Sequence, residues 1–239
     1  MRLLAVETST MTGAVGLLEG GRVVAESRVS VAVTHGERLM AAIDGVLRAA
    51  RWELGDLEAF AVALGPGSFT GLRIGLSTVK GLAFATGKPA IGVPTLEALA
   101  WRLPYCAYPV CPVLDARKNE VYAALYRTLE GRLELLEAPR AVAPATLAED
   151  LRATTSGPVV FVGDAVGPFG PVLGEILGAR AHLAPADLRL PSAVTVGELG
   201  ARALARGETA DPADLVPLYL RPSEAELARE RRQSAGRPD

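Results

Sequence analysis

Short, continuous apolar runs along the first hundred residues are typical of buried strands. The runs are Leu3–Val6, Ala14–Leu18, the more polar but strand-like Arg22–Arg28, and Ala59–Leu64. A Gly-Gly pair at residues 20–21 separates the second and third runs and predicts a hairpin. Apolar positions at helical spacing predict a helix from residue 34 or 35 to Arg51, and a second helix that continues to about Thr86.

The resulting order, β-β-β-α-β-α, resembles one half of a ribonuclease-H-like domain. The pattern returns in part after the Pro-bearing stretch Leu103–Pro112. The elements expected there are strands at Val113–Ala116, Glu120–Tyr126, Val159–Val162 and Ala181–Leu183, and a helix at Val194–Arg206. We therefore predict an α/β protein with an N-terminal domain at 1–104, a smaller C-terminal domain at 105–221 and a charged tail at 222–239.

A glycine-rich stretch, GPGSFTGLRIG at residues 65–75, joins the strand at Ala59 to the second helix. A strand that ends in such a turn presents free backbone N–H groups at a helix start, which is anion-binding geometry. The alternative is a tight turn in which glycine permits positive φ and close backbone approach. The stretch at residues 65–75 lacks the P-loop pattern, because no Lys follows Gly71. The loop residues are Gly65, Pro66, Gly67, Ser68, Phe69 and Thr70.

The helix that follows has Arg73 and Lys80 as its only charges and small or apolar residues nearly all round. A helix without a broad polar face is covered on more than one side. We expect it to pair with the preceding helix and to present an interface to a partner protein; the alternative is that all of this surface is internal core. The expected interface residues are Leu39, Met40, Ile43, Leu47, Gly71, Leu72, Arg73, Gly75, Leu76 and Val79.

Composition and charge narrow the class further. The chain has 239 residues and 49% hydrophobic residues, enough to bury a sizeable core. The net charge is −2 and only three lysines occur, so we do not expect the chain to bind RNA strongly by itself. No apolar run reaches the ~20 residues of a membrane span, and we expect a cytoplasmic protein. The two cysteines, Cys106 and Cys111, are expected to be free thiols.

Six segments together carry a resemblance to a known family. They are MRLLAVETST, THGERLMAAIDGVL, GPGSFTGLRIG, KPAIGVPTLEALA, VLDARKNEVYAALY and LVPLYLR. In this order, over about residues 1–221, they resemble the TsaB (YeaZ-type) family, paralogues of TsaD. The resemblance implies the two-domain fold of actin-like ATPases with a reduced second domain. It also implies a non-catalytic role in the threonylcarbamoyladenosine modification of tRNAs that read ANN codons, with TsaD and TsaE as partners.

The sequence contains few candidates for catalytic or metal-binding residues. A metal site with paired histidines is nearly excluded, because His35 and His182 are the only histidines and lie far apart. The alternative function is an ATP-dependent phosphotransferase of the actin-like fold. Its first phosphate turn would be Glu7, Thr8, Ser9 and Thr10, where Glu7 replaces the family's usual Asp, and its second would be Gly163 and Asp164. Asp115, Arg117 and Glu120 could form an ion-paired hairpin or a solvated turn.

We therefore expect that the chain has no catalytic residues, no bound metal and no cofactor of its own. Binding of a nucleotide at the interface with the partner protein is the one exception that the sequence allows. The turn Glu7–Thr10 is interpreted as a vestigial phosphate turn. The expected assembly is a homodimer for the isolated chain and a complex with TsaD and TsaE homologues for the active system, with tRNA held only through that complex.

Overall fold

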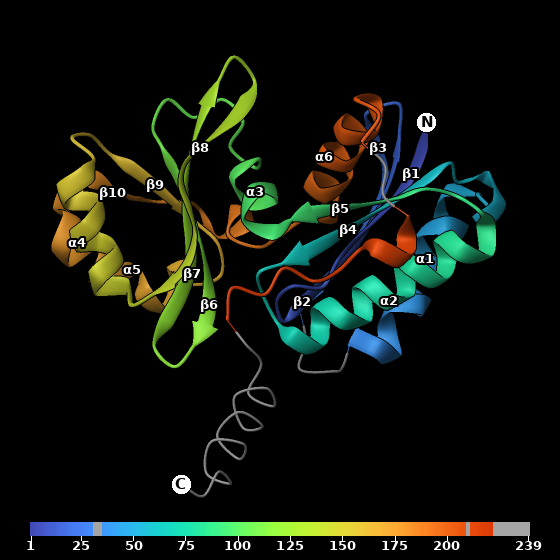
Figure 1. Cartoon of the computed structure of the whole chain (residues 1–239), viewed down its shortest axis with the longest axis horizontal. Coiled ribbons are helices and arrows are strands. Elements are labelled where there is room, and N and C mark those ends of the chain that lie inside the picture. The colour runs from blue at the N-terminus through green and yellow to red at the C-terminus, as the bar shows by residue number, and fades with distance from the viewer. Residues whose placement is uncertain (31–34, 209–210, 222–239) are drawn as a thin grey trace, which may run out of the picture.

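The computed structural model describes residues 1–30, 35–208 and 211–221, and it has two halves, each built around a five-stranded sheet (Figure 1). The first sheet contains β1 (Arg2–Glu7), β2 (Thr12–Glu19), β3 (Arg22–Ser30), β4 (Ala59–Gly65) and β5 (Ala90–Pro94), in the order β3-β2-β1-β4-β5. Strands β1, β2 and β3 pair antiparallel, whereas β4 runs parallel to β1 and β5 parallel to β4.

The second sheet repeats this topology. It contains β6 (Val110–Arg117), β7 (Glu120–Leu129), β8 (Arg132–Val142), β9 (Val159–Val162) and β10 (Ala181–Leu183), in the order β10-β9-β6-β7-β8. Strands β6, β7 and β8 are antiparallel, and β9 and β10 are parallel additions beside β6. The predicted repeat of an α/β unit is therefore confirmed, and both copies have the strand order of a ribonuclease-H-like fold.

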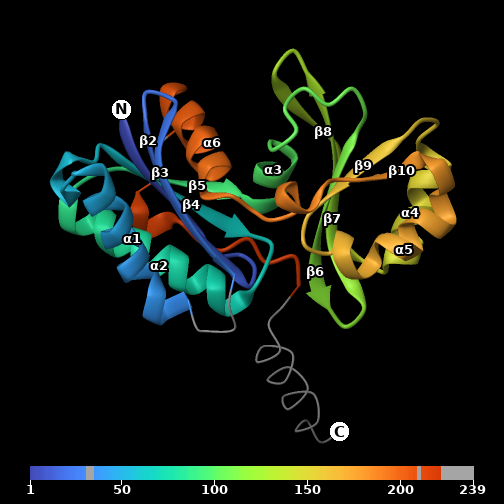
Figure 2. The ribbon, with the colours of Figure 1, turned by 180° about the vertical axis from the view of Figure 1, so that it is seen from behind.

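Helices cover both faces of the first sheet. Helices α1 (His35–Ala50) and α2 (Phe69–Thr86) pack on one face, where Ile43 and Val79 join Leu4 and Val62 in one core. Helix α6 (Ala193–Ala205) covers the opposite face, as the view from behind shows (Figure 2). Gly197 lets α6 approach closely, because a Cβ there would overlap the side chain of Leu18.

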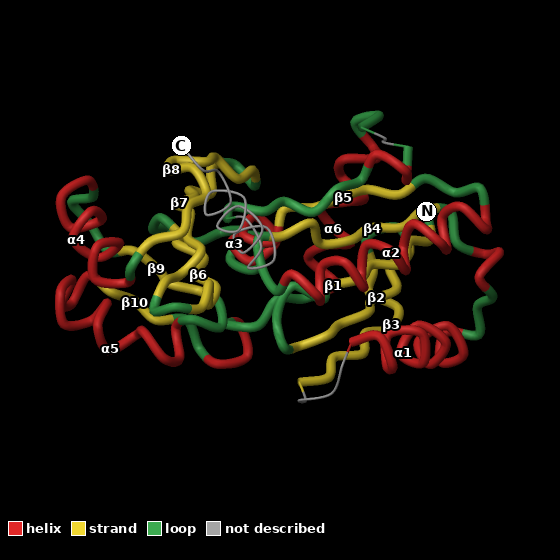
Figure 3. Tube along the Cα trace, turned by 60° about the horizontal axis from the view of Figure 1, so that its bottom comes forward, coloured by secondary structure: helices red, strands yellow, loops and turns green. Residues whose placement is uncertain are grey.

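The second sheet is covered less evenly. Helices α4 (Pro144–Thr154) and α5 (Val166–Leu177) pack on one face, and the short helix α3 (Thr95–Ala100) lies against the other. Figure 3 shows α3 between the two sheets, where Leu96 and Leu99 pack against Val110 and Leu114. Among the residues that the structure describes, no helix is long and apolar enough to cross a membrane.

Several sequence expectations need correction. Strands β5 and β8 were not predicted, and helix α6, which we assigned to the C-terminal domain, packs on the first sheet. The apolar face of α6 is buried against β1, β2 and β4, and the domain division at 104/105 stays a prediction. The helix start expected at residue 34 and the tail at 222–239 lie outside the described residues.

Candidate functional site

The glycine-rich loop is folded tightly against the turn that follows β1. The N–H of Ser68 donates a 2.6 Å hydrogen bond to the carbonyl oxygen of Ser9, and the Thr8 hydroxyl donates to the carbonyl oxygen of Gly71 at 2.8 Å. A Cβ on Gly67 would overlap that Ser9 carbonyl. Ser68 also caps α2 by accepting from the N–H of Gly71. Of the two interpretations of this loop, the geometry favours close backbone approach over an open anion cradle.

The turn Glu7–Thr10 is closed in the same way. Glu7, Thr8 and Ser9 are at most 1% exposed, and Thr10 is 6% exposed. Glu7 Oε1 accepts a 2.5 Å hydrogen bond from the N–H of Ser9, and the N–H of Thr12 donates to the Thr10 hydroxyl. The side chains of the turn thus already accept hydrogen bonds from the N–H groups of Ser9 and Thr12.

The carboxyl groups of Glu7 and Asp164 both have raised pKa values. Burial raises the pKa of Glu7 from 4.5 to about 7, hydrogen bonding from Ser9 opposes this rise, and the nearby charge of Asp164 adds to it. Burial likewise raises the pKa of Asp164, which lies after β9. The glycine-rich loop and the Glu7 side chain thus already occupy the turn.

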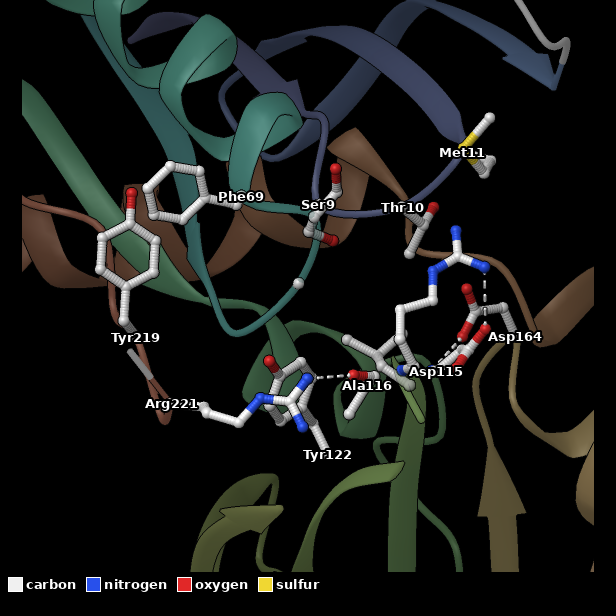
Figure 4. A pocket seen from close by; sticks show the side chains of 14 residues that line it. Ser9, Thr10, Met11, Phe69, Asp115, Ala116, Tyr122, Asp164, Tyr219 and Arg221 are labelled. Atoms are coloured by element: carbon white, nitrogen blue, oxygen red, sulfur yellow. Dashed lines mark hydrogen bonds and ion pairs between the residues drawn. The ribbon is translucent and has the colours of Figure 1, made fainter. Parts of the chain in front are cut away.

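A cleft of about 330 Å³ opens between the two halves, next to this turn (Figure 4). Its walls come from the β1 turn, the glycine-rich loop, the β6–β7 turn, the end of β9 and the C-terminal segment. The lining residues are Ser9, Thr10, Met11, Gly67, Ser68, Phe69, Leu114, Asp115, Ala116, Arg117, Tyr122, Asp164, Tyr219 and Arg221. Within the described part of the chain, no group of three or more His, Cys, Asp or Glu side chains could hold a metal ion.

The charged side chains of the cleft come from three places: Asp115 and Arg117 at the end of β6, Asp164 after β9 and Arg221 in the C-terminal segment. Asp164 accepts a 3.1 Å hydrogen bond from the N–H of Asp115, which ties the end of β9 to β6. Arg117 forms an ion pair with Asp115 at 3.3 Å. Glu120, the third residue of the expected hairpin cluster, instead pairs with Arg221 at 2.6 Å. The ion-paired interpretation thus holds for Asp115 and Arg117 only.

Most of the expected partner-interface residues lie inside the single chain. Six are apolar side chains at most 8% exposed: Leu39, Ile43, Leu47, Leu72, Leu76 and Val79. Gly71 and Gly75 are buried as well, because α2 rests on the β1 turn. Met40 is 52% exposed, and Arg73 is exposed too. Eight of the ten residues are therefore buried within the single chain, Met40 and Arg73 are exposed, and the partner interface itself stays a prediction.

Tyr219 and Arg221 line the cleft, although no motif in the sequence marks them as site residues. Both belong to the segment after Leu215, which returns from the first half to the cleft. The run LVPLYLR at residues 215–221 carries an apolar signal, but it gives no indication of where this segment lies.

Comparisons with known proteins agree with this architecture. The family model described as TsaD, tRNA N6-adenosine threonylcarbamoyltransferase, matches residues 28–229. The tRNA threonylcarbamoyladenosine biosynthesis protein TsaB of Bacillus subtilis is 33% identical over 226 residues, which cover 95% of this chain and 96% of that protein. The structure of YeaZ from Pseudomonas aeruginosa has a TM-score of 0.77 at 31% identity and covers 92% of this chain and 99% of that one.

The fold likeness extends further. The activator of 2-hydroxyisocaproyl-CoA dehydratase from Clostridium difficile, solved with bound ADPNP, has a TM-score of 0.52 at 10% identity and covers 87% of this chain and 97% of that one. The repeated sheets and the cleft between them define a protein of the actin-like ATPase fold. Within that class, the chain belongs to the TsaB (YeaZ-type) family, paralogous to TsaD.

Proposed function

We propose that this chain takes part in threonylcarbamoyladenosine biosynthesis on tRNAs that read ANN codons, as the non-catalytic partner of a TsaD homologue. Membership of the TsaB family supports the pathway, because relatives of nearly equal length carry that name. The assignment of TsaD and TsaE homologues as partners, and of a homodimer for the isolated chain, is part of the same proposal.

The observation that supports the non-catalytic role is the closed turn Glu7–Thr10. Glu7 occupies the N–H of Ser9 with its own carboxylate, and the glycine-rich loop lies against the Ser9 carbonyl. A nucleotide phosphate at this turn would have to displace the glycine-rich loop and the Glu7 side chain. The geometry therefore favours a scaffold over the alternative of an ATP-dependent phosphotransferase.

The proposed partner face is formed by the outer surfaces of α1 and α2. These helices contact each other, and their buried sides hold them on the first sheet. Exposed apolar side chains remain on the outside: Met40 on α1 is 52% exposed and Phe84 on α2 is 89% exposed. Contiguous apolar surface marks interaction sites, and Met40 and Phe84 are the apolar positions at which this face can be probed. The buried residues of these helices would support this face without touching the partner.

Transfer RNA would reach this chain only through the assembled complex. The formal net charge is −2, and tRNA binding depends on basic groups that neutralise phosphates. Cytoplasmic location follows from the proposed role in tRNA modification and is likewise a proposal.

The test is co-purification with a TsaD homologue, followed by a modification assay in which each protein is omitted in turn. We expect product only when this chain and the TsaD homologue are both present. Met40→Asp should reduce co-purification, whereas Leu129→Asp, on a residue 57% exposed in the second half, should not. Full modification without this chain would refute the role, and product formed by this chain without the TsaD homologue would refute the non-catalytic assignment.

A further inference from the structure

The segment from Asp211 to Arg221 runs along α2 and then crosses to the second half, as the orange-red end of the described chain shows (Figures 1 and 2). It is fastened to the first half at three points. Lys80 Nζ donates a 2.8 Å hydrogen bond to the carbonyl oxygen of Ala213, and Leu215 is buried in the core under α1 and α2. The N–H of Leu218 donates to the carbonyl oxygen of Leu64, at the end of β4, at 2.7 Å.

Three side chains join this segment to the glycine-rich loop. The ring of Tyr219 stacks on Phe69 with centroids 4.8 Å apart and planes 25° apart. The Arg73 guanidinium lies 3.8 Å from the centroid of the Phe69 ring, and Arg73 Nε donates a 3.1 Å hydrogen bond to the Tyr219 hydroxyl. A stacked ring pair combined with a cation–π contact is favourable and directional. Phe69, Arg73 and Tyr219 thus fix loop, helix and C-terminal segment to one another.

Two residues further on, the segment is fastened to the second half. Arg221 Nη1 donates to Glu120 Oε2 at 2.6 Å, and Arg221 Nη2 donates to the carbonyl oxygen of Ala116 at 2.8 Å. Both acceptors belong to the β6–β7 hairpin that forms the opposite wall of the cleft (Figure 4). The guanidinium is only partly exposed, so its ion pair is screened less than one on the open surface.

Only one residue separates Tyr219 from Arg221, so the chain between these two attachments is short. Two residues of fully extended chain span at most about 7 Å. Because Tyr219 is held on one wall of the cleft and Arg221 on the other, the walls cannot separate by more than a few ångströms on this side unless one attachment breaks.

We propose that residues 215–221 form a strap that sets the opening of the cleft, with Tyr219 and Arg221 as its positioning residues. The strap also holds the glycine-rich loop and the first turn of α2 in place. On the basis of the proposed function, it thereby fixes the orientation of the partner face relative to the second half, which the TsaD homologue senses on binding.

The test measures the distance between the halves in the isolated full chain. Spin labels at Ser77→Cys on α2 and Glu149→Cys on α4, both exposed positions, report on the opening in a Cys106→Ser background, where Cys111 stays buried. We expect one narrow distance distribution for the strap-intact chain. Tyr219→Ala and Arg221→Ala should broaden it or shift it by several ångströms.

Two controls separate the strap from general damage. Arg127→Ala removes an ion pair with Glu134 at 2.7 Å that lies within the second half, and it should leave the distribution unchanged. Tyr219→Phe keeps the stacked ring and should restore the narrow distribution. Should a strap variant fail to fold, Glu120→Gln weakens the same attachment from the other wall and should also broaden the distribution.

Distances in Tyr219→Ala, Arg221→Ala and Glu120→Gln that all match the strap-intact chain would overturn the strap. The effect of the strap on partner binding is measured separately, as the amount of protein retained on an immobilised TsaD homologue. Retention should fall several-fold for Arg221→Ala and should not change for Arg127→Ala. Equal retention of the two variants would contradict this effect. Failure of the unmodified chain to bind would overturn the proposed function, while the distance measurement would still decide on the strap.

Discussion

The main-chain N–H of Ser9 donates a 2.5 Å hydrogen bond to the carboxylate of Glu7, and neither residue is more than 1% exposed. The other carboxylate oxygen, Oε2, has no hydrogen-bond partner among the described residues. A buried carboxylate with one oxygen unsatisfied is costly in its charged form. The turn therefore contains an ionisable group whose charge opposes folding.

This arrangement predicts a pH-dependent stability. The folded state raises the pKa of Glu7 from 4.5 to about 7, so between these values it holds the proton more tightly than the unfolded chain does. Stability should fall as pH rises through this window, by about 3 kcal/mol at most, and then level off. Glu7→Gln cannot ionise, and in urea unfolding between pH 4.5 and 8 its stability should show a smaller fall.

The matched control is Glu149→Gln, at an exposed position of α4, which should keep the pH dependence of the unaltered chain. Parallel curves for Glu7→Gln and the unaltered chain would show that Glu7 does not titrate in this range.

The strands that the sequence failed to predict share a physical cause. Strand β8 is an edge strand in which Leu135 is 51% exposed and Leu136 is 39% exposed, so apolar residues do not alternate cleanly with polar ones. It also contains Pro139, which edge strands tolerate. Strand β5 is short and includes Gly92 and Pro94. Both strands are stabilised by pairing with strands that are distant in the sequence, and the local pattern of apolar and polar residues does not reveal such pairing.

The site was predictable in its local parts only. Periodicity and the glycine-rich stretch located the β1 turn and the loop before α2. The cleft itself depends on contacts such as Leu218 with Leu64 and Arg221 with Glu120, which are far apart along the chain. The sequence left two possibilities open for Leu76 and Ile43, because an apolar helix face indicates coverage without telling whether a sheet or a partner protein provides it.

Neighbouring residues of α1 should respond differently to truncation. Ile43 is 2% exposed and packs in the first core, so Ile43→Ala should lower the free energy of unfolding by about 2–4 kcal/mol. Met40 is 52% exposed, and Met40→Ala should change the free energy of unfolding by less than about 0.5 kcal/mol. Urea unfolding of both variants measures the difference. A loss of similar size at Met40 would mean that its side chain is buried in solution.

The two thiols should differ in reactivity. Cys111 is fully buried in β6, and burial raises the pKa of its thiol, whereas Cys106 is partly exposed. Because the thiolate is the reactive form, a thiol-disulfide reagent should modify Cys106 quickly in the native chain and Cys111 only after unfolding. Cys106→Ser should remove the fast phase. Equal rates for both thiols under native conditions would contradict the burial of Cys111.

Two glycines of α2 allow the packing of the loop region to be tested within one helix. A Cβ on Gly75 would overlap the Thr8 hydroxyl, which already donates to the Gly71 carbonyl, whereas a Cβ on Gly81 would meet nothing within 4 Å. Gly75→Ala should therefore lower the free energy of unfolding by about 1–3 kcal/mol, through forced displacement of the β1 turn. Gly81→Ala should raise it by about 0.5–1 kcal/mol, because alanine is the better helix former. The opposite signs, measured by thermal and urea unfolding, separate the close approach of α2 to the turn from helix propensity. If Gly75→Ala were as stable as Gly81→Ala, helix α2 would have to lie farther from Thr8, and the turn would have room for a phosphate.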